Sequence, residues 1–111
     1  MDTDMEEIMA RAGELGRLIQ GTDIYKSFIR LSESLHADEE AAKMLDDYTR
    51  YLKGIKERQE RGDIVEKFEI EHARNLADEA YEHEVVRKYL DAQKEYLELL
   101  YRIQREINDV E

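Results

Sequence analysis

The sequence predicts an all-α protein, a five-helix array that ends in one long C-terminal helix. Apolar residues recur at steps of three and four through almost the whole chain, which is the spacing of amphipathic helices. Charged residues make up 41% of the 111 residues, and the absence of proline means that no helix is broken by that residue. Residues that favour strands are sparse. We therefore expect a single helical domain over residues 1–111.

The first two predicted helices are separated by a short break at Gly21 to Asp23. Gly13 and Gly16 fall inside the first helix, where each costs about 1 kcal/mol relative to alanine. The apolar stripes consist of Met5, Ile8, Ala12, Leu15 and Ile19 in the first helix and of Ile24, Phe28, Leu31 and Leu35 in the second.

The third and fourth predicted helices are marked by capping residues. Asp38 is a good N-cap for the third helix, and Gly62 is the residue type that most often follows a helix. Asp63 and Glu66 then predict a capping box at the start of the fourth helix. The third helix carries Ala41, Leu45, Tyr48, Leu52 and Ile55 on one face, and the fourth has a weaker stripe of Val65, Phe68, Ala73, Leu76, Ala77 and Ala80. Because the stripe of the fourth helix consists mostly of small residues, we expect this helix to lie close against a larger one.

The last helix, which starts after the boundary at His83 and Glu84, is apolar along two adjacent stripes. One stripe is Val85, Tyr89, Ala92, Tyr96, Leu99, Ile103, Ile107 and Val110, and the other is Val86, Leu90, Leu97, Leu100 and Tyr101. Two stripes indicate two sets of neighbours, since one stripe is enough for a helix in a bundle.

The length of this helix raises the question of what covers it. Roughly 26 residues at 1.5 Å each form a rod of about 39 Å, as long as a domain of this size. Either the other four helices cover both stripes, or part of the surface binds a second chain. We expect self-association or a helical partner. The residues assigned to this interface are Tyr89, Tyr96, Leu97, Leu100, Tyr101, Ile103 and Ile107.

Composition excludes several classes of function. The chain has no cysteine, so disulfides, thiolate metal sites and cysteine nucleophiles are ruled out together. A net charge of −11 disfavours direct binding to nucleic acid or to anionic lipid. The N-terminal segment is acidic and has no long apolar run, and no stretch approaches the roughly 20 apolar residues that span a bilayer. We expect a cytoplasmic protein without membrane insertion.

Two Glu-x-x-His pairs are the only candidates for a metal site. They are Glu33 with His36 and Glu69 with His72, and such pairs on two helices, joined by glutamates from two more, bind two metal ions in some helical bundles. The other helices show no glutamate within their apolar faces, and glutamate is frequent in this chain. We therefore expect no metal, no cofactor and no catalytic residue. A metal-binding helical-bundle enzyme and a purely structural oligomer are the alternatives.

The segment from Arg50 to Arg61 is basic within an acidic chain. It holds five basic residues against two acidic ones, Glu57 and Glu60, a net charge of +3. Cations at the C-terminal end of a helix offset the helix dipole, which is the simplest explanation. An acidic partner or RNA is the other candidate.

Two stretches resemble the YlbF/YmcA family of small helical bacterial regulators, which includes YheA-like members. They are "LIQGTDIYKSFIRLSESLHADEEAAKML" and "VVRKYLDAQKEYLELLYRIQREI". The first is similar to the end of helix one, the short helix two and the acidic opening of helix three in the family. The second has the family's spacing of valine, tyrosine-leucine, alanine and double leucine. The resemblance covers nearly the whole chain and implies an array of five helices that associates with itself or with paralogues.

The resemblance also implies a function. Relatives act as non-enzymatic regulators in competence, sporulation and biofilm formation, work in a complex with a third protein, and are linked to mRNA processing by a membrane-bound endoribonuclease. Some bind iron–sulfur clusters through cysteines, which this chain lacks. The family often has proline near the start of the last helix, where this chain has Glu84. We expect a regulator or adaptor that works through helix-mediated protein contacts and has no activity of its own.

Overall fold

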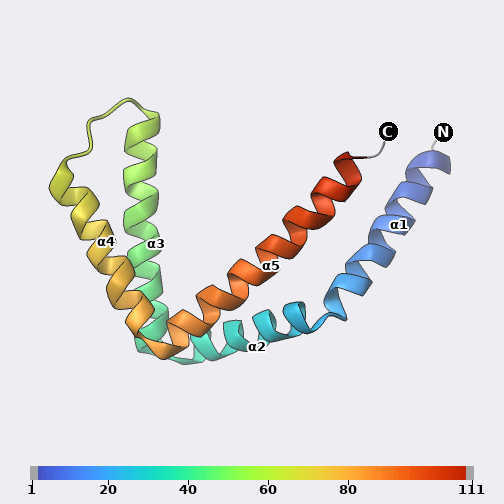
Figure 1. Cartoon of the computed structure of the whole chain (residues 1–111), viewed down its shortest axis with the longest axis horizontal. Helices are drawn as coiled ribbons and strands as arrows, with labels where there is room; N and C mark the ends of the chain where they lie inside the picture. Colours follow the sequence, from blue (N-terminus) through green and yellow to red (C-terminus); the bar gives the residue numbers. More distant parts are fainter. Residues whose placement is uncertain (1–2, 110–111) are drawn as a thin grey trace. The chain divides into compact units, whose positions relative to one another are not determined.

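The computed structural model describes residues 3–109 and contains five helices in that range (Figure 1). The helices are α1 (Thr3–Gln20), α2 (Asp23–Ala37), α3 (Glu39–Glu60), α4 (Lys67–Glu82) and α5 (Glu84–Asn108). Residues 3–109 contain no strand, so the all-α prediction is confirmed. Val110, the last member of one predicted stripe, lies outside the described residues. Within the described range, no helix is long and apolar enough to cross a membrane.

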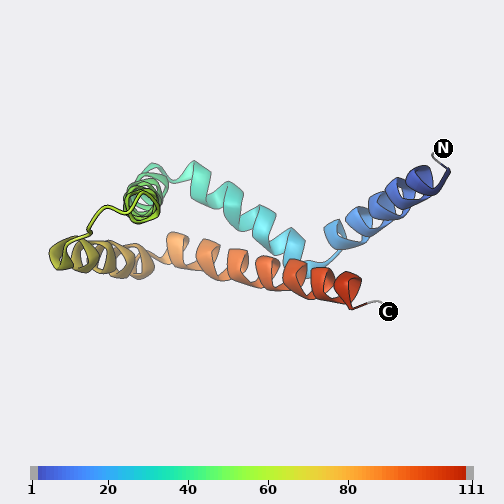
Figure 2. The ribbon, with the colours of Figure 1, turned by 90° about the horizontal axis from the view of Figure 1, so that it is seen from above.

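The described residues group into two compact units. The terminal unit comprises residues 3–30 and 92–109, and the hairpin unit comprises residues 31–91. Helices α2 and α5 each contribute to both units, and Figure 2 shows α5 as one continuous helix. The single domain expected for residues 1–111 stays a prediction.

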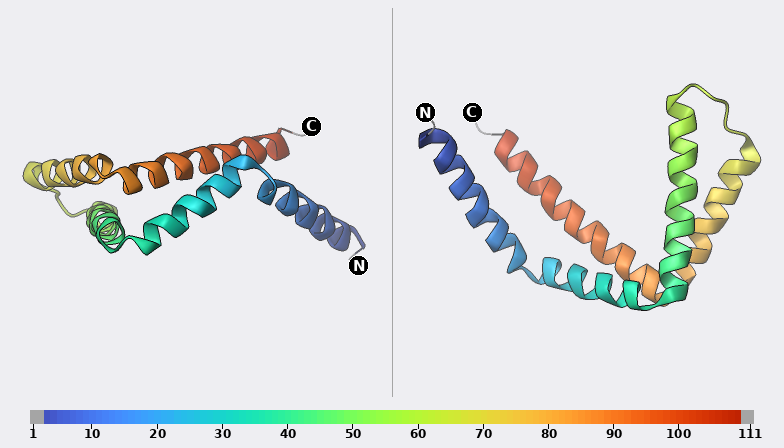
Figure 3. Two further views of the ribbon diagram at one scale, coloured as in Figure 1. Left: turned by 90° about the horizontal axis from the view of Figure 1, so that it is seen from below. Right: turned by 180° about the vertical axis from the view of Figure 1, so that it is seen from behind.

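The hairpin unit is built on α3 and α4, which run side by side in opposite directions and are joined by a short loop (Figure 3). Its buried core consists of Leu35, Ala41, Ala80 and Val86, with Met44, Leu45, Val85, Tyr89 and Leu90 packed against it. Ala41, Ala80 and Val86 have no exposed surface. Alanines at 73 and 80 are the buried residues of α4, which agrees with the close packing expected from its small side chains.

Side-chain and backbone caps fix both ends of α3. The carboxylate of Asp38 accepts a hydrogen bond from the amide of Ala41 at 3.0 Å, as predicted for an N-cap. At the other end, Gly62 has a φ of 86°, a conformation that side chains disfavour. The amide of Gly62 donates to the carbonyl of Gln59 at 3.0 Å, and the amide of Asp63 donates to that of Arg58 at 2.9 Å. This pair of bonds is a Schellman motif.

The predicted start of the fourth helix at Asp63 is wrong, because α4 begins at Lys67 with Glu66 as its N-cap. Asp63 belongs to the end of α3: its amide closes the Schellman motif, and its carboxylate pairs with Arg61 at 3.2 Å. The capping box is shifted by three residues. The amide of Glu66 donates to the carboxylate of Glu69 at 2.8 Å.

The terminal unit contains α1, the start of α2 and the C-terminal part of α5. Thr22 joins the first two helices, because its hydroxyl donates to the carbonyl of Ile19 at 2.6 Å and accepts from the amide of Tyr25 at 3.1 Å. The ring of Tyr96 on α5 stacks on Phe28 at a centroid distance of 5.1 Å and meets the edge of Tyr25 at 5.7 Å. Despite these contacts, no described residue of this unit is buried.

Candidate functional site

The two apolar stripes of α5 are covered over only part of their length. In the hairpin unit, Val86 is fully buried and Val85, Tyr89 and Leu90 pack against the same core. In the terminal unit, the stripes continue without a single buried residue among those described. The chain therefore buries the apolar residues of the first two turns of α5, whereas the later turns are covered only in part.

The structure divides the residues predicted for the interface into three groups. Tyr89 belongs to the hairpin core, and Tyr96 belongs to the aromatic cluster with Tyr25 and Phe28. The other five lie on the C-terminal part of α5 and form what we call the α5 surface: Leu97, Leu100, Tyr101, Ile103 and Ile107. Leu97 is 46% exposed, Tyr101 is 65% exposed and Ile107 is 61% exposed, whereas Leu100 and Ile103 are half-buried.

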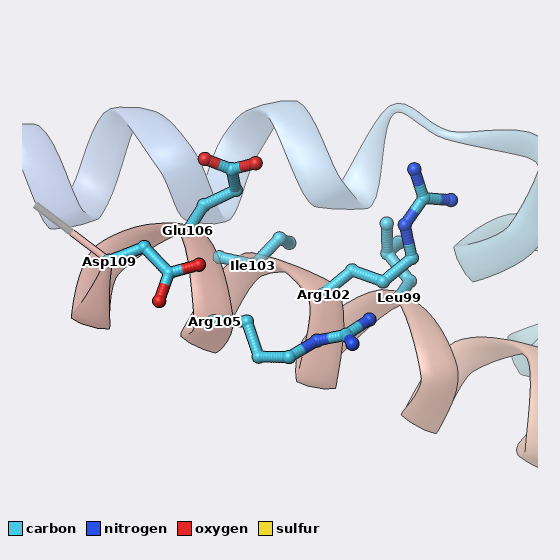
Figure 4. A pocket seen from close by; sticks show the side chains of 6 residues that line it. All are labelled: Leu99, Arg102, Ile103, Arg105, Glu106 and Asp109. Carbon is cyan, nitrogen blue, oxygen red and sulfur yellow. The ribbon is translucent and has the colours of Figure 1, made fainter.

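A hollow of about 380 Å³ lies along the last turns of α5, lined by Leu99, Arg102, Ile103, Arg105, Glu106 and Asp109. Figure 4 shows the charged groups of the arginines and the two acids extending from the helix around Ile103. Four of the six lining residues are charged, so this hollow is more polar than the apolar core of a typical protein–protein interface. The two arginines and two acids balance, so the lining of this hollow carries no net charge.

A second exposed apolar surface, on α1, was not predicted from the sequence. Every residue from 3 to 12 is exposed, including Met5, Ile8 and Met9, each with more than half of its surface accessible. The pattern itself was visible in the sequence as an ordinary amphipathic stripe. Only the structure reveals that the described residues of its own unit leave this stripe uncovered.

Three residues of the two Glu-x-x-His pairs, Glu69, His72 and His36, make contacts within the chain. Glu69 accepts a hydrogen bond from Arg58 at 2.6 Å while it caps α4, and the ring of His72 packs edge-on against Tyr51 at a centroid distance of 4.8 Å. The Nδ1 atom of His36 lies 2.7 Å from the carbonyl of Ser32 in its own helix. Residues 3–109 hold no group of three or more histidine or acidic side chains placed to bind a metal ion.

The Arg58–Glu69 ion pair joins the last turn of α3 to the first turn of α4, next to the loop of the hairpin. Hydrogen bonding to Glu69 raises the pKa of Arg58, and the hydrogen bonds from Arg58 and from the amide of Glu66 lower the pKa of Glu69. Arg58 also donates to the carbonyl of Ile64 at 3.2 Å. The pair therefore ties α3, the loop and α4 together, which is a structural role rather than that of a proton donor.

Most of the basic segment is engaged within the chain. Besides Arg58, Arg50 pairs with Asp46 and Arg61 pairs with Asp63. Lys53 and Lys56 form no ion pair with a described carboxylate and are exposed. Arg58 lies in the last turn of α3, and the dipole explanation stays a prediction.

The model of one protein family, described as "Control of competence regulator ComK, YlbF/YmcA", matches residues 8–110. The chain belongs to this family. The resemblance of the two quoted stretches is thereby confirmed, and the description of the YlbF/YmcA family relates it to the control of a regulator. No curated protein matched the chain.

A solved structure titled "Protein of Unknown Function (DUF964) from Bacillus stearothermophilus" is similar to this YlbF/YmcA chain. The TM-score is 0.83 at 21% sequence identity, over 91% of this chain and 89% of the other. A likeness at this identity supports the five-helix fold and gives no information about a ligand or partner.

Proposed function

We propose that this protein is a non-enzymatic regulator that acts through contacts of the α5 surface with a second copy, a paralogue or another helical protein. The proposal rests on the exposure of apolar side chains in the terminal unit. This unit exposes Leu97, Tyr101 and Ile107 on α5, and none of its described residues is buried. Burying apolar surface contributes about 25 cal/mol per Å², so such a surface favours association.

The family supports the regulatory part of this proposal, since its description names the control of competence regulator ComK. By resemblance, the process controlled is competence, sporulation or biofilm formation, with a link to mRNA processing. The acidic chain favours an indirect link to RNA through a protein partner, because its net charge of −11 repels phosphate.

A partner-capture experiment with matched variants tests the proposal. The wild-type protein, Tyr101→Ser and the control Ile70→Ser are used to recover proteins from lysate of the native cell. Ile70 is also an exposed apolar residue, but it lies on α4. We expect a partner or the untagged copy of the chain to be recovered by the wild type and the control, and lost with Tyr101→Ser. Equal recovery by all three would remove the α5 surface from the proposal.

The metal-enzyme alternative is tested by elemental analysis of the purified protein. Stoichiometric iron, manganese or zinc that is lost in His72→Ala would replace the adaptor proposal with a metalloprotein.

Direct RNA binding is tested by a gel shift at physiological salt with wild type and Lys53→Glu. Binding that depends on Lys53 would place RNA among the ligands.

A further inference from the structure

Helix α5 carries a row of residues with the spacing of a coiled coil. Its members follow one another at alternating steps of three and four, the pattern by which two helices interlock along their length. We call this row the α5 seam, and it consists of Leu90, Gln93, Leu97, Leu100, Gln104 and Ile107. Leu90 packs against the hairpin core, whereas Leu97 is 46% exposed and Ile107 is 61% exposed. Most of the seam is therefore left for another helix.

The α5 seam is symmetric about its midpoint, which lies between positions 98 and 99. The pairs of residues at equal distances from this midpoint are Leu97 with Leu100, Gln93 with Gln104, and Leu90 with Ile107. In an antiparallel pair of identical helices, these are the residues that meet across the interface. Leucine then meets leucine, glutamine meets glutamine, and leucine meets isoleucine. The seam is thus complementary to itself, which is what a two-fold interface requires.

The two glutamines fix the register of such a pair. A buried amide group without a hydrogen-bond partner is costly, but two amides satisfy each other because each has donors and an acceptor. Gln93 also interacts within its own chain, and the number of donors and acceptors on an amide allows both contacts. A slip of one heptad would set Gln104 against Leu100 and leave the amide unpaired. A polar residue at a seam position specifies alignment in this way.

The hairpin core favours the antiparallel orientation over the parallel one. In a parallel pair each residue meets its own copy, and the heptad spacing continues back to Val86, four residues before Leu90. Val86 has no exposed surface, because residues of α2, α3 and α4 share its core. An antiparallel pair needs no seam residue before Leu90. Its last layer joins Leu90 to Ile107, near the end of the partner helix at Asn108.

The residues beside the seam fit the same arrangement. The antiparallel register brings Lys94 of one copy next to Tyr101 of the other, and both side chains are exposed. An ammonium group over a tyrosine ring is a favourable contact. On the opposite flank, Tyr96 stacks on Phe28 of its own chain at a centroid distance of 5.1 Å. One flank is therefore covered within the chain, and the other is open to a second copy.

We propose that the α5 surface binds the α5 surface of a second copy in antiparallel orientation, with Gln93 of each copy paired with Gln104 of the other. The inference rests on the proposed function and narrows it, because it selects a second copy over a paralogue or another helical protein. The paired seam runs from Leu90 to Ile107, roughly 27 Å of helix. Two leucine pairs form its centre, a glutamine pair lies on each side of them, and a leucine–isoleucine pair closes each end.

Disulfide trapping reads the orientation directly, because the chain has no cysteine. Protein with Gln93→Cys is mixed under mild oxidation with tagged protein that carries Gln104→Cys, and the dimers are separated on a non-reducing gel. We expect the 93–104 dimer to form faster than the 93–93 and 104–104 dimers, since like positions lie about 16 Å apart along an antiparallel pair.

The matched control for trapping pairs Gln104→Cys with Glu95→Cys, an exposed position on the side of α5 opposite the seam. We expect this dimer to form slowly. Equal rates for the 93–104 and 95–104 dimers would overturn the proposal. A preference for the 93–93 and 104–104 dimers would also overturn it, because that result requires a parallel pair.

Replacement of the glutamines by leucine tests the register without cysteine. In Gln93→Leu or Gln104→Leu alone, each remaining glutamine faces a leucine, so we expect association about tenfold weaker than wild type in sedimentation equilibrium. The double variant restores like against like and should associate at least as tightly as wild type, which also shows that the variants fold. Single changes that each tighten association would indicate a parallel pair, and effects that simply add in the double variant would indicate a different partner. Either result refutes the proposal.

The oligomeric state and partner capture together separate failure of this inference from failure of the proposed function. A wild type that is monomeric at tens of micromolar, yet recovers another protein in a way that depends on Tyr101, would overturn the second copy as occupant and leave the proposed function in place. Recovery of proteins that is insensitive to Tyr101→Ser, together with a dimer that is insensitive to both glutamine changes, would overturn the two together.

Discussion

Replacement of Ile107 by serine gives a quantitative test of the α5 surface. Ile107 is 61% exposed, so its removal takes little packing from the isolated chain. Isoleucine and serine also have similar helix propensities, which leaves α5 itself almost unaffected. The variant should therefore unfold like wild type when both are measured as monomers, at high dilution.

The effect on association follows from the exposed fraction of the side chain. Full burial of isoleucine is worth roughly 2.5 kcal/mol, and burial of the exposed 61% of Ile107 is worth about 1.5 kcal/mol. In a two-fold dimer each chain contributes one such residue, for a total of about 3 kcal/mol. The dissociation constant should rise about a hundredfold.

Sedimentation equilibrium over a range of concentrations measures this constant, with Ile70→Ser on α4 as the matched control. We expect a large increase for Ile107→Ser and almost none for the control. The reasoning is refuted if the two variants shift the constant equally, or if the wild type is a monomer at tens of micromolar.

Three further predictions concern the hairpin unit. Asp38→Ala removes the N-cap of α3 and should lower the unfolding free energy by about 1 kcal/mol, measured by urea denaturation. Gly62→Ala places a side chain at a φ of 86° and should cost about 1 kcal/mol in the same assay, whereas no loss would show that the loop rearranges. The pKa of Glu69 is lowered in the folded state, so its stabilising effect is present above the ordinary value of 4.5 and is lost as the pH falls through the folded pKa. Melting temperatures between neutral pH and pH 3 should therefore fall less steeply in Glu69→Gln than in wild type, and equal slopes would contradict this role of the pair with Arg58.

Helix number and most helix ends could be predicted from the sequence because they depend on local chemistry. Asp38, Gly62 and the break at Gly21 each act on residues within one turn, and each was correctly interpreted. The start of α4 was not, since two acidic residues, Asp63 and Glu66, compete for the role of N-cap. The choice between them depends on the Schellman motif at the end of α3 and on the reach of Arg58, which are matters of three-dimensional geometry.

The candidate surface was harder to predict. A periodic stripe indicates that a helix has an apolar side, but it carries no information about which turns the same chain will cover. Val86 and Tyr101 belong to the same stripe, yet one is fully buried and the other is 65% exposed. The exposed side of α1 was missed for the same reason.

Helix α5 runs from a buried core to an exposed end. Amide exchange at its start can therefore serve as a reference for amide exchange at its end. Backbone amides near Val86 exchange with solvent only when the hairpin core opens, whereas those near Ile107 exchange whenever the last turns fray. Slower exchange near Ile107, with exchange near Val86 unchanged, therefore means that something covers the far end of the helix and that the core is no more stable than before. Deuterium uptake along this one segment would report occupancy of the α5 surface without a label on either protein.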